Sequence, residues 1–153
     1  MTSDFSINDH NIRMNGFKSA IKNGNKMAVI YEKEIHDNDE EAFRITRELL
    51  EKDKDINGIF IAAGGISGVA KAVESLGLKG KVKIVCFDFV QSTIGYIRNG
   101  VISNSIGQDP FGQGYNPVIY LFNLLMNGNK PDSEKMWSRM DVVNSKNVDD
   151  MLL

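Results

Sequence analysis

Two polar side chains stand directly after apolar stretches of the sequence, at positions where strands are expected to end. Asp88 follows the apolar stretch 82–87, and Gln108 follows a shorter one at 101–106. Ligands of a parallel α/β sheet bind in the crevice beyond the carboxyl ends of its strands. A carboxylate and a side-chain amide at this edge are suited to hydrogen-bond hydroxyl groups. The pattern therefore predicts a crevice that binds a polyol.

Each of these residues also has a purely structural interpretation. Asp88 could cap the helix predicted to follow it, although Gln91 and Ser92 lie nearer its start, and Gln108 could bridge backbone groups of a loop. Arg13 is a third candidate, because its planar guanidinium offers several donors to hydroxyls or carboxylates. Its simpler interpretation is a surface arginine. The residues alone leave both possibilities open for all three.

Patterns typical of catalysis or metal binding are lacking. His10 and His36 have no metal-ligand spacing, and the sequence contains no G-x-S-x-G or P-loop motif. The acidic run 37–41 lacks EF-hand spacing and is expected to be a solvated helix start. Gly64-Gly65 resembles a weak phosphate-binding turn, but tight packing of a strand against a helix accounts for it better. We expect a protein that is not an enzyme and uses no metal or cofactor.

The composition is that of an ordinary globular domain. The chain has 153 residues, 25% charged and 42% hydrophobic, and a formal net charge of -2, so no basic excess favours nucleic-acid contact. No apolar run approaches the roughly 18 residues of a membrane span. The first ten residues lack the features of a signal peptide. Cys86, the single cysteine, is expected to be a buried small side chain. The presence of one cysteine weakly favours a protein of a reducing compartment.

Helical and strand patterns alternate along the chain. Helical periodicity predicts helices at 8–22, 37–52, 66–76, 92–99 and 110–126, the first with Asn8 or Asp9 as its N-cap. Apolar runs predict strands at 27–31, 56–63, 82–87, 101–106 and 138–143. Such alternation indicates βαβ units. We predict an α/β fold, a three-layer αβα lobe with a mostly parallel sheet over residues 1–143, followed by a polar tail at 144–153.

Four segments resemble type I periplasmic-binding proteins. They are D-H-N-I-R-M-N-G-F at 9–17, the apolar strand at 58–62, V-C-F-D at 85–88 and I-G-Q-D-P-F-G-Q-G-Y at 106–115. Their order and spacing resemble the C-terminal lobe of sugar-binding proteins of ABC transporters and of effector domains of LacI-type transcriptional regulators. The resemblance covers nearly the whole chain. It implies that Arg13, Asp88 and Gln108 bind ligand hydroxyls.

The sequence departs from the family pattern in two respects. Ala63 stands where many members have a ligand-binding asparagine, which removes a hydrogen-bonding group and leaves the identity of the ligand open. The family clamps its ligand between two lobes, and the resemblance covers the second lobe only. The helix within 110–128 would pack on the first lobe. Its apolar face is therefore expected to fold back on its own sheet or to pair with another copy of the chain.

The resemblance implies the effector domain of a LacI-type transcriptional regulator, in which a sugar or sugar-like ligand closes a two-lobe hinge. The alternatives are a substrate-binding protein of a sugar ABC transporter, an α/β enzyme acting on a sugar phosphate, and a plain dimerisation module. The cysteine usage and the missing export signal favour the regulator and a cytoplasmic location; an extracytoplasmic location goes with the transporter. DNA would be read only by a region outside this chain. We also expect a homodimer.

Overall fold

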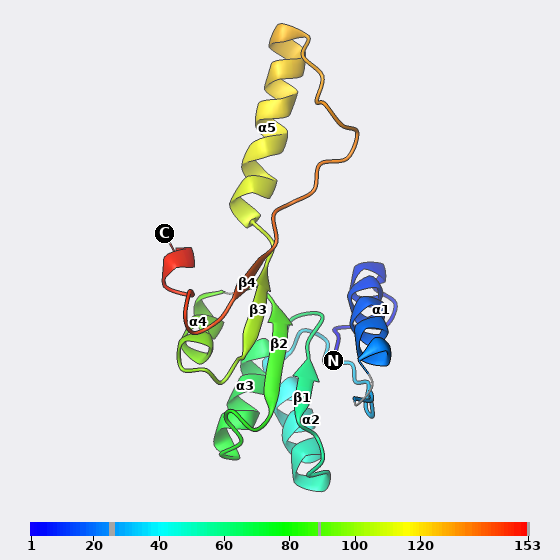
Figure 1. Cartoon of the computed structure of the whole chain (residues 1–153), viewed down its shortest axis with the longest axis vertical. Helices are drawn as coiled ribbons and strands as arrows, with labels where there is room; N and C mark the ends of the chain where they lie inside the picture. The colour runs from blue at the N-terminus through cyan, green and yellow to red at the C-terminus, as the bar shows by residue number, and fades with distance from the viewer. Residues whose placement is uncertain (25–26, 89, 153) are drawn as a thin grey trace.

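A four-stranded sheet forms the centre of the molecule (Figure 1). The computed structural model describes residues 1–24, 27–88 and 90–152. The strands are β1 (Gly58–Phe60), β2 (Lys83–Phe87), β3 (Asn104–Gly107) and β4 (Asp141–Val143), in the order β1-β2-β3-β4. β1, β2 and β3 are mutually parallel, whereas β4 joins the edge of β3 in the antiparallel direction. The predicted αβα fold with a mostly parallel sheet is confirmed.

The helices also follow the predicted order. They are α1 (Asn8–Asn23), α2 (Asp39–Lys52), α3 (Ile66–Ser75), α4 (Gln91–Arg98) and α5 (Pro110–Asn127), with a short 3-10 helix η1 (Asp150–Leu152) at the end. α2 begins after Asn38, whose side chain accepts a hydrogen bond from the amide of Glu41 at 2.9 Å. The prediction that Asn8 or Asp9 caps α1 is wrong: Ile7 holds that position and makes no side-chain cap.

The two faces of the sheet are covered by different helices. Strand alternation turns Ile84 and Cys86 of β2 into one hydrophobic core, which also contains Ala42 of α2, Val69 of α3 and Ile97 of α4. The intervening residues face α1. There the ring of Phe17 stacks on that of Phe60 at a centroid distance of 4.3 Å, and Phe60 meets Phe87 edge to face at 6.0 Å. The sheet is thereby apolar on both faces, as parallel strands require.

Residues 27–31 do not form the predicted strand. The described residues 27–33 are extended but belong to no strand, and a cavity of about 540 Å³ separates them from β1. A strand forms only when its backbone is hydrogen-bonded to a neighbouring strand. The apolar composition of M-A-V-I-Y favours a strand but does not ensure that such a neighbour is present. The end of the segment meets residue 2: the amide of Thr2 donates to the carbonyl of Lys33 at 3.0 Å, and Glu34 forms a parallel bridge with Thr2.

α5 projects away from the sheet, and residues 128–140 return beside it to β4 (Figure 1). Phe111 and Leu125 of α5 are 76% and 72% exposed, and Trp137 of the returning segment is 87% exposed. The prediction that this helix folds back on its own sheet is therefore wrong, whereas pairing with another copy stays a prediction. The predicted polar tail at 144–153 packs on the domain through Val148, which is buried in the core.

Truncating the core should destabilise the domain strongly. Ile84 is fully buried at the centre of the sheet, so Ile84→Ala leaves a cavity and is expected to lower the free energy of unfolding by about 2–5 kcal/mol. Urea denaturation followed by circular dichroism measures this loss. Val142→Ala, in the exposed face of β4, is the control and should change stability by less than about 1 kcal/mol. Equal losses in both variants would contradict this description of the core.

Candidate functional site

Asp88 and Gln108 lie side by side at the carboxyl ends of two adjacent strands. The register pairs Phe87 of β2 with Ile106 of β3, and the amide of Asp88 donates to the carbonyl of Ile106 at 2.9 Å. The side-chain amide Nε2 of Gln108 donates to Oδ1 of Asp88 at 2.8 Å. The structure thus brings the two residues into contact at the predicted edge of the sheet, and their binding of a ligand stays a prediction.

Arg13 reaches the same edge from α1. Its Nη2 donates to Oε1 of Gln108 at 2.8 Å, and its Nη1 donates to the carbonyl of Ala62 at 2.9 Å. Gln108 thus links the guanidinium to the carboxylate of Asp88. Arg13, Gln108 and Asp88, called here the polar triad, come from three elements that are up to 95 positions apart in sequence.

The ring of Phe87 supports the polar triad. The guanidinium carbon of Arg13 lies 4.2 Å from the ring centroid of Phe87, the residue directly before Asp88. A cation over an aromatic face contributes about 0.5–2 kcal/mol, depending on how dry the contact is. Phe87 is itself buried against Phe60. The arginine is consequently held in a fixed orientation rather than being a free surface side chain.

The backbone on either side of the triad is also fixed. Asp88 adopts a left-handed conformation with φ of 61°, and its carbonyl accepts a hydrogen bond from the hydroxyl of Ser105. A non-glycine residue in this region is uncommon, and such residues concentrate at functional sites. Asp88 does not cap α4: the amide of Val90 bonds instead to the hydroxyl of Thr93 at 3.1 Å.

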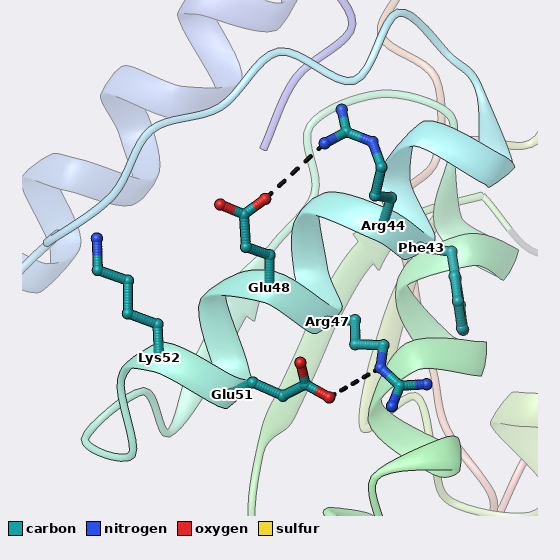
Figure 2. A pocket seen from close by; sticks show the side chains of 6 residues that line it. All are labelled: Phe43, Arg44, Arg47, Glu48, Glu51 and Lys52. Atoms are coloured by element: carbon teal, nitrogen blue, oxygen red, sulfur yellow. Dashed lines mark hydrogen bonds and ion pairs between the residues drawn. The ribbon is translucent and has the colours of Figure 1, made fainter.

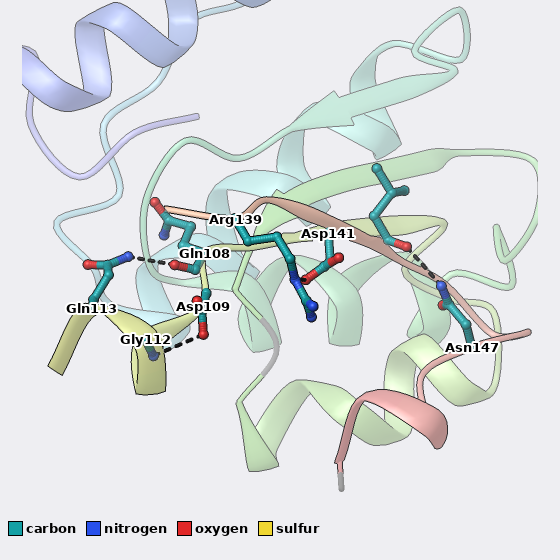
Figure 3. A network of polar contacts seen from close by, with 8 residues as sticks. Gln108, Asp109, Gly112, Gln113, Arg139, Asp141 and Asn147 are labelled. Carbon is teal, nitrogen blue, oxygen red and sulfur yellow. Dashed lines mark hydrogen bonds and ion pairs between the residues drawn. The ribbon is translucent and has the colours of Figure 1, made fainter. Parts of the chain in front are cut away.

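Figure 3 shows how β3 joins α5 beside the triad. Asp109, with φ of 52°, caps α5 by accepting a hydrogen bond from the amide of Gly112 at 3.0 Å, and Gln113 donates from its side chain to the carbonyl of Gln108. A Cβ atom at position 112 would lie 2.1 Å from Oδ2 of Asp109, so a larger residue would displace the carboxylate that caps α5. This turn fixes the backbone from which the Gln108 side chain projects.

The triad presents a donor-rich and an acceptor-rich end on one surface. Asp88 is exposed, and Gln108 donates to its Oδ1 atom. The second carboxylate oxygen can therefore accept a hydrogen bond from a ligand hydroxyl. Arg13 uses two of its five N–H donors on the protein. The arrangement suits a neutral polyhydroxylated ligand. Among the described contacts of the polar triad, none pairs a base with a nucleophile.

Sequence reasoning missed two contributors to this site, Phe87 and the carbonyl of Ala62. Strand alternation places Phe87 on the face of the sheet that lies away from the main core. This pattern could have indicated that its ring supports a residue on that face. The role of the Ala62 carbonyl depends on the conformation of a turn and had no such signal. Ala63, next to it, is buried and offers only a methyl group where the family resemblance leads one to expect an asparagine.

Backbone amides at and just after the Gly64-Gly65 turn are hydrogen-bonded to carboxylates of the protein. The amide of Gly64 donates to Oδ1 of Asp37 at 2.7 Å, and the amide of Gly68 donates to Oδ1 of Asp39 at 3.1 Å. Two carboxylates therefore take two backbone donors at the start of α3, and their negative charge would repel a phosphate there. A Cβ atom at Gly68 would lie 1.9 Å from the carbonyl oxygen of Asp39, which explains the glycine by close packing of α2 on α3.

The hollow on the outer face of α2 does not resemble a ligand site. The hollow in Figure 2 is lined by α2 side chains alone, including the exposed pairs Arg44–Glu48 at 3.8 Å and Arg47–Glu51 at 2.8 Å. Such pairs one helical turn apart are ordinary surface interactions. Within residues 1–24, 27–88 and 90–152, no group of three or more His, Cys, Asp or Glu side chains could hold a metal ion, and none of the helices is long and apolar enough to cross a membrane.

Comparison with known proteins identifies the fold family. Residues 1–130 match the model of the periplasmic binding protein domain. The chain belongs to this family. A solute-binding protein of an ABC transporter from Agrobacterium vitis, solved with alpha-D-tagatopyranose, has a TM-score of 0.85 and 25% identity over 97% of this chain and 50% of that chain.

Two further relatives give the same result. A sugar-binding protein of an ABC transporter from Bacillus halodurans has a TM-score of 0.83 and 25% identity over 97% of this chain and 55% of its own. The fructose import binding protein FruE of Bifidobacterium longum is 36% identical over 98 residues, which are 59% of this chain and 30% of FruE. This periplasmic-binding-protein lobe thus spans about half the length of the solved structures, and less of FruE.

The thiol of Cys86 should be unreactive in the folded lobe. Burial raises the pKa of Cys86 from 9.0 to about 11, although the hydroxyl of Ser105 partly opposes this shift. At pH 8 the thiolate fraction falls about 100-fold relative to an ordinary thiol, so modification by a disulfide reagent should be slower by at least that factor. Absorbance assays with and without denaturant measure both rates. Comparable rates in the two states would contradict the buried placement.

Proposed function

We propose that this chain is the ligand-binding lobe of a sugar-binding protein that serves sugar import. The observation that carries the proposal is the polar triad, held at the carboxyl ends of β2 and β3 and backed by Phe87. Carboxylate, amide and guanidinium groups together can donate to and accept from vicinal hydroxyls. The similar import and solute-binding proteins described above support a sugar as the ligand.

Recognition would use the groups that the triad leaves free. A ligand hydroxyl donates to the exposed carboxylate of Asp88, and further hydroxyls accept from the remaining N–H groups of Arg13. Because the Arg13–Gln108–Asp88 bonds already exist, little side-chain entropy is lost on binding. Ala63 contributes no hydrogen bond, so the lobe would select a ligand with an apolar or unsubstituted edge there. With one lobe alone, affinity is low, and closure of a second lobe would raise it.

The transport alternative is favoured over the LacI-type regulator to which the sequence pointed. The similar proteins found are described as import, solute-binding or ABC-transporter proteins, and none of those reported above is described as a DNA-binding regulator. An extracytoplasmic location follows from this role, in place of the cytoplasmic one first expected. Cys86 is fully buried, and a buried thiol needs no reducing compartment, so the single cysteine does not favour the cytoplasm.

An enzyme acting on a sugar phosphate is the less favoured function. The amide of Gly64 is bonded to Asp37, and the amide of Gly68 in the first turn of α3 is bonded to Asp39. The carboxylate of Asp88 has an amide and a guanidinium for neighbours, and general acid-base catalysis needs a second titratable partner within reach. We therefore assign the lobe to binding rather than catalysis.

Removing the carboxylate of Asp88 should weaken selective sugar binding strongly. A thermal-shift screen at high millimolar fructose, tagatose, glucose and galactose is expected to raise the Tm of the parent chain for a subset of these sugars. In Asp88→Ala the affinity should fall by about 10- to 100-fold, as expected for loss of a charged hydrogen-bond partner. Isothermal titration with the responding sugar measures the change.

Asp132→Ala is the matched control, because it removes an exposed carboxylate from the segment after α5. It should leave the sugar response unchanged. Arg13→Lys keeps the charge but loses the planar donor set and should weaken binding in the same direction as Asp88→Ala. If the folded parent chain responds to no sugar, or if Asp88→Ala responds like the parent, the proposed ligand class is wrong.

We further propose that isolated copies of this chain pair through α5. Phe111, Tyr115, Val118, Phe122 and Leu125 recur at spacings of four and three residues, which is the repeat of a helix-helix seam. All five are more than half exposed, and α5 contains no charged residue that would oppose its pairing with a copy of itself. An apolar stripe of this size in water marks an interaction site.

Size-exclusion chromatography with light scattering tests this pairing. The parent chain should have the mass of a dimer, and Phe122→Asp should have that of a monomer because it places a charge in the seam. Asn116→Asp adds the same charge to an exposed polar position of α5 and should remain dimeric. A monomeric parent chain would overturn the proposal without affecting the sugar assignment.

A further inference from the structure

The turn between β1 and α3 helps to hold Arg13 in place. It has the sequence Ala-Ala-Gly-Gly at 62–65, and the carbonyl of Ala62 accepts a hydrogen bond from Nη1 of Arg13 at 2.9 Å. None of its four residues carries a side chain that can hydrogen-bond, and the two glycines widen the range of conformations open to the backbone. The turn therefore relies on other elements to keep this carbonyl directed at Arg13.

Asp37 holds the same turn from the segment before α2. Its Oδ1 accepts a hydrogen bond from the amide of Gly64 at 2.7 Å, two residues after the carbonyl that Arg13 uses. A Cβ atom at position 64 would lie 2.7 Å from Oδ1 and 3.1 Å from Cγ of Asp37. The carboxylate thus fills the space that a side chain at position 64 would take, and an ionised acceptor makes a strong hydrogen bond.

The direction in which the Asp37 side chain projects is set by its own backbone. The amide of Asn38 donates to the carbonyl of Ile35 at 2.8 Å, and the two residues between them have φ of 47° at His36 and 52° at Asp37. Two successive positive φ values are those of a type I′ turn. Ile35 is fully buried and Asn38 caps α2, so both ends of this turn are anchored.

The packing of α2 on α3 does not account for Asp37. Asp39 already joins these helices, because its Oδ1 accepts from the amide of Gly68 at 3.1 Å. Asp37 lies before the start of α2 and is exposed. The two carboxylates differ in what they hold: Gly68 lies within α3, whereas Gly64 belongs to the turn that meets Arg13.

We propose that Asp37 is a positioning residue of the candidate sugar site. By fixing Gly64 it keeps the carbonyl of Ala62 directed at Arg13, and the guanidinium stays in the orientation from which it can donate to hydroxyls. Asp37 acts through the turn and does not itself touch the ligand. This role rests on the proposed function, which assigns Arg13 to the ligand, whereas the contact between Asp37 and Gly64 does not depend on it.

Four variants of the full chain test this role. Asp37→Gly removes the carboxylate without straining the turn, because glycine adopts positive φ freely. Asp37→Asn keeps an oxygen acceptor for Gly64, and asparagine also tolerates this conformation. Gly64→Ala displaces the carboxylate from the opposite partner of the bond. Asp39→Ala removes an equal charge and the bond to Gly68, and is the matched control.

Nitrogen relaxation at Nε of Arg13 measures how firmly the guanidinium is held. Its order parameter should be that of a rigid group, about 0.85, in the parent chain, Asp37→Asn and Asp39→Ala, and should fall toward about 0.6 in Asp37→Gly and Gly64→Ala. The affinity for the responding sugar should fall by about 3- to 10-fold in the same two variants only. Their effects should not add in the double variant, because each breaks the same bond.

An unchanged order parameter in Asp37→Gly would overturn the proposal. An equal loss of order in Asp39→Ala would also overturn it, because it would indicate general loosening of α2 against α3. Loss of affinity in Asp37→Asn with a rigid Arg13 would assign Asp37 to direct contact with the ligand instead. Loss of order in Asp37→Gly and Gly64→Ala, without sugar binding by any chain, would support the positioning of Arg13 and overturn the proposed function alone. Circular dichroism verifies that each variant stays folded.

Discussion

Parallel pairing of β2 with β3 is the interaction on which the rest of the lobe depends. It buries Ile84 and Cys86 on one face and brings two strand ends to the same edge of the sheet. Asp88 and Gln108 follow those ends directly, so their contact is a consequence of the register and not of any attraction between the side chains. A shift by one residue would turn the apolar side chains outward and separate the two polar groups.

The remaining elements hold that edge in place. α1 packs Phe17 on Phe60 and so brings Arg13 over Phe87, where it bonds to Gln108. Asp88 and Asp109 adopt left-handed backbone conformations that cost of order 1 kcal/mol each. The hydroxyl of Ser105 and the amide of Gly112 stabilise these conformations, and the result is a polar edge that needs little rearrangement to meet hydroxyl groups.

Two features of the described residues stand apart from the packed core. The uncharged stripe of α5 extends beyond the sheet and is exposed, and a cavity of about 540 Å³ lies between β1 and residues 27–33. The first is a surface of side chains on one helix, whereas the second is bordered by the edge strand of the sheet. The periplasmic-binding-protein relatives described above are about twice as long as this chain.

The sequence by itself determined the features that each element carries alone. Periodicity predicted α1 to α5 and the strands at β1 to β4, because every element must bury its own apolar face, and the strand-end rule predicted Asp88 and Gln108. Only the tertiary structure decided that Arg13 bonds to Gln108, that Asp37 and Asp39 occupy the amides of Gly64 and Gly68, that α5 leaves the sheet and that residues 27–31 stay unpaired. These outcomes depend on which distant groups come within hydrogen-bonding distance, and no local pattern contains that information.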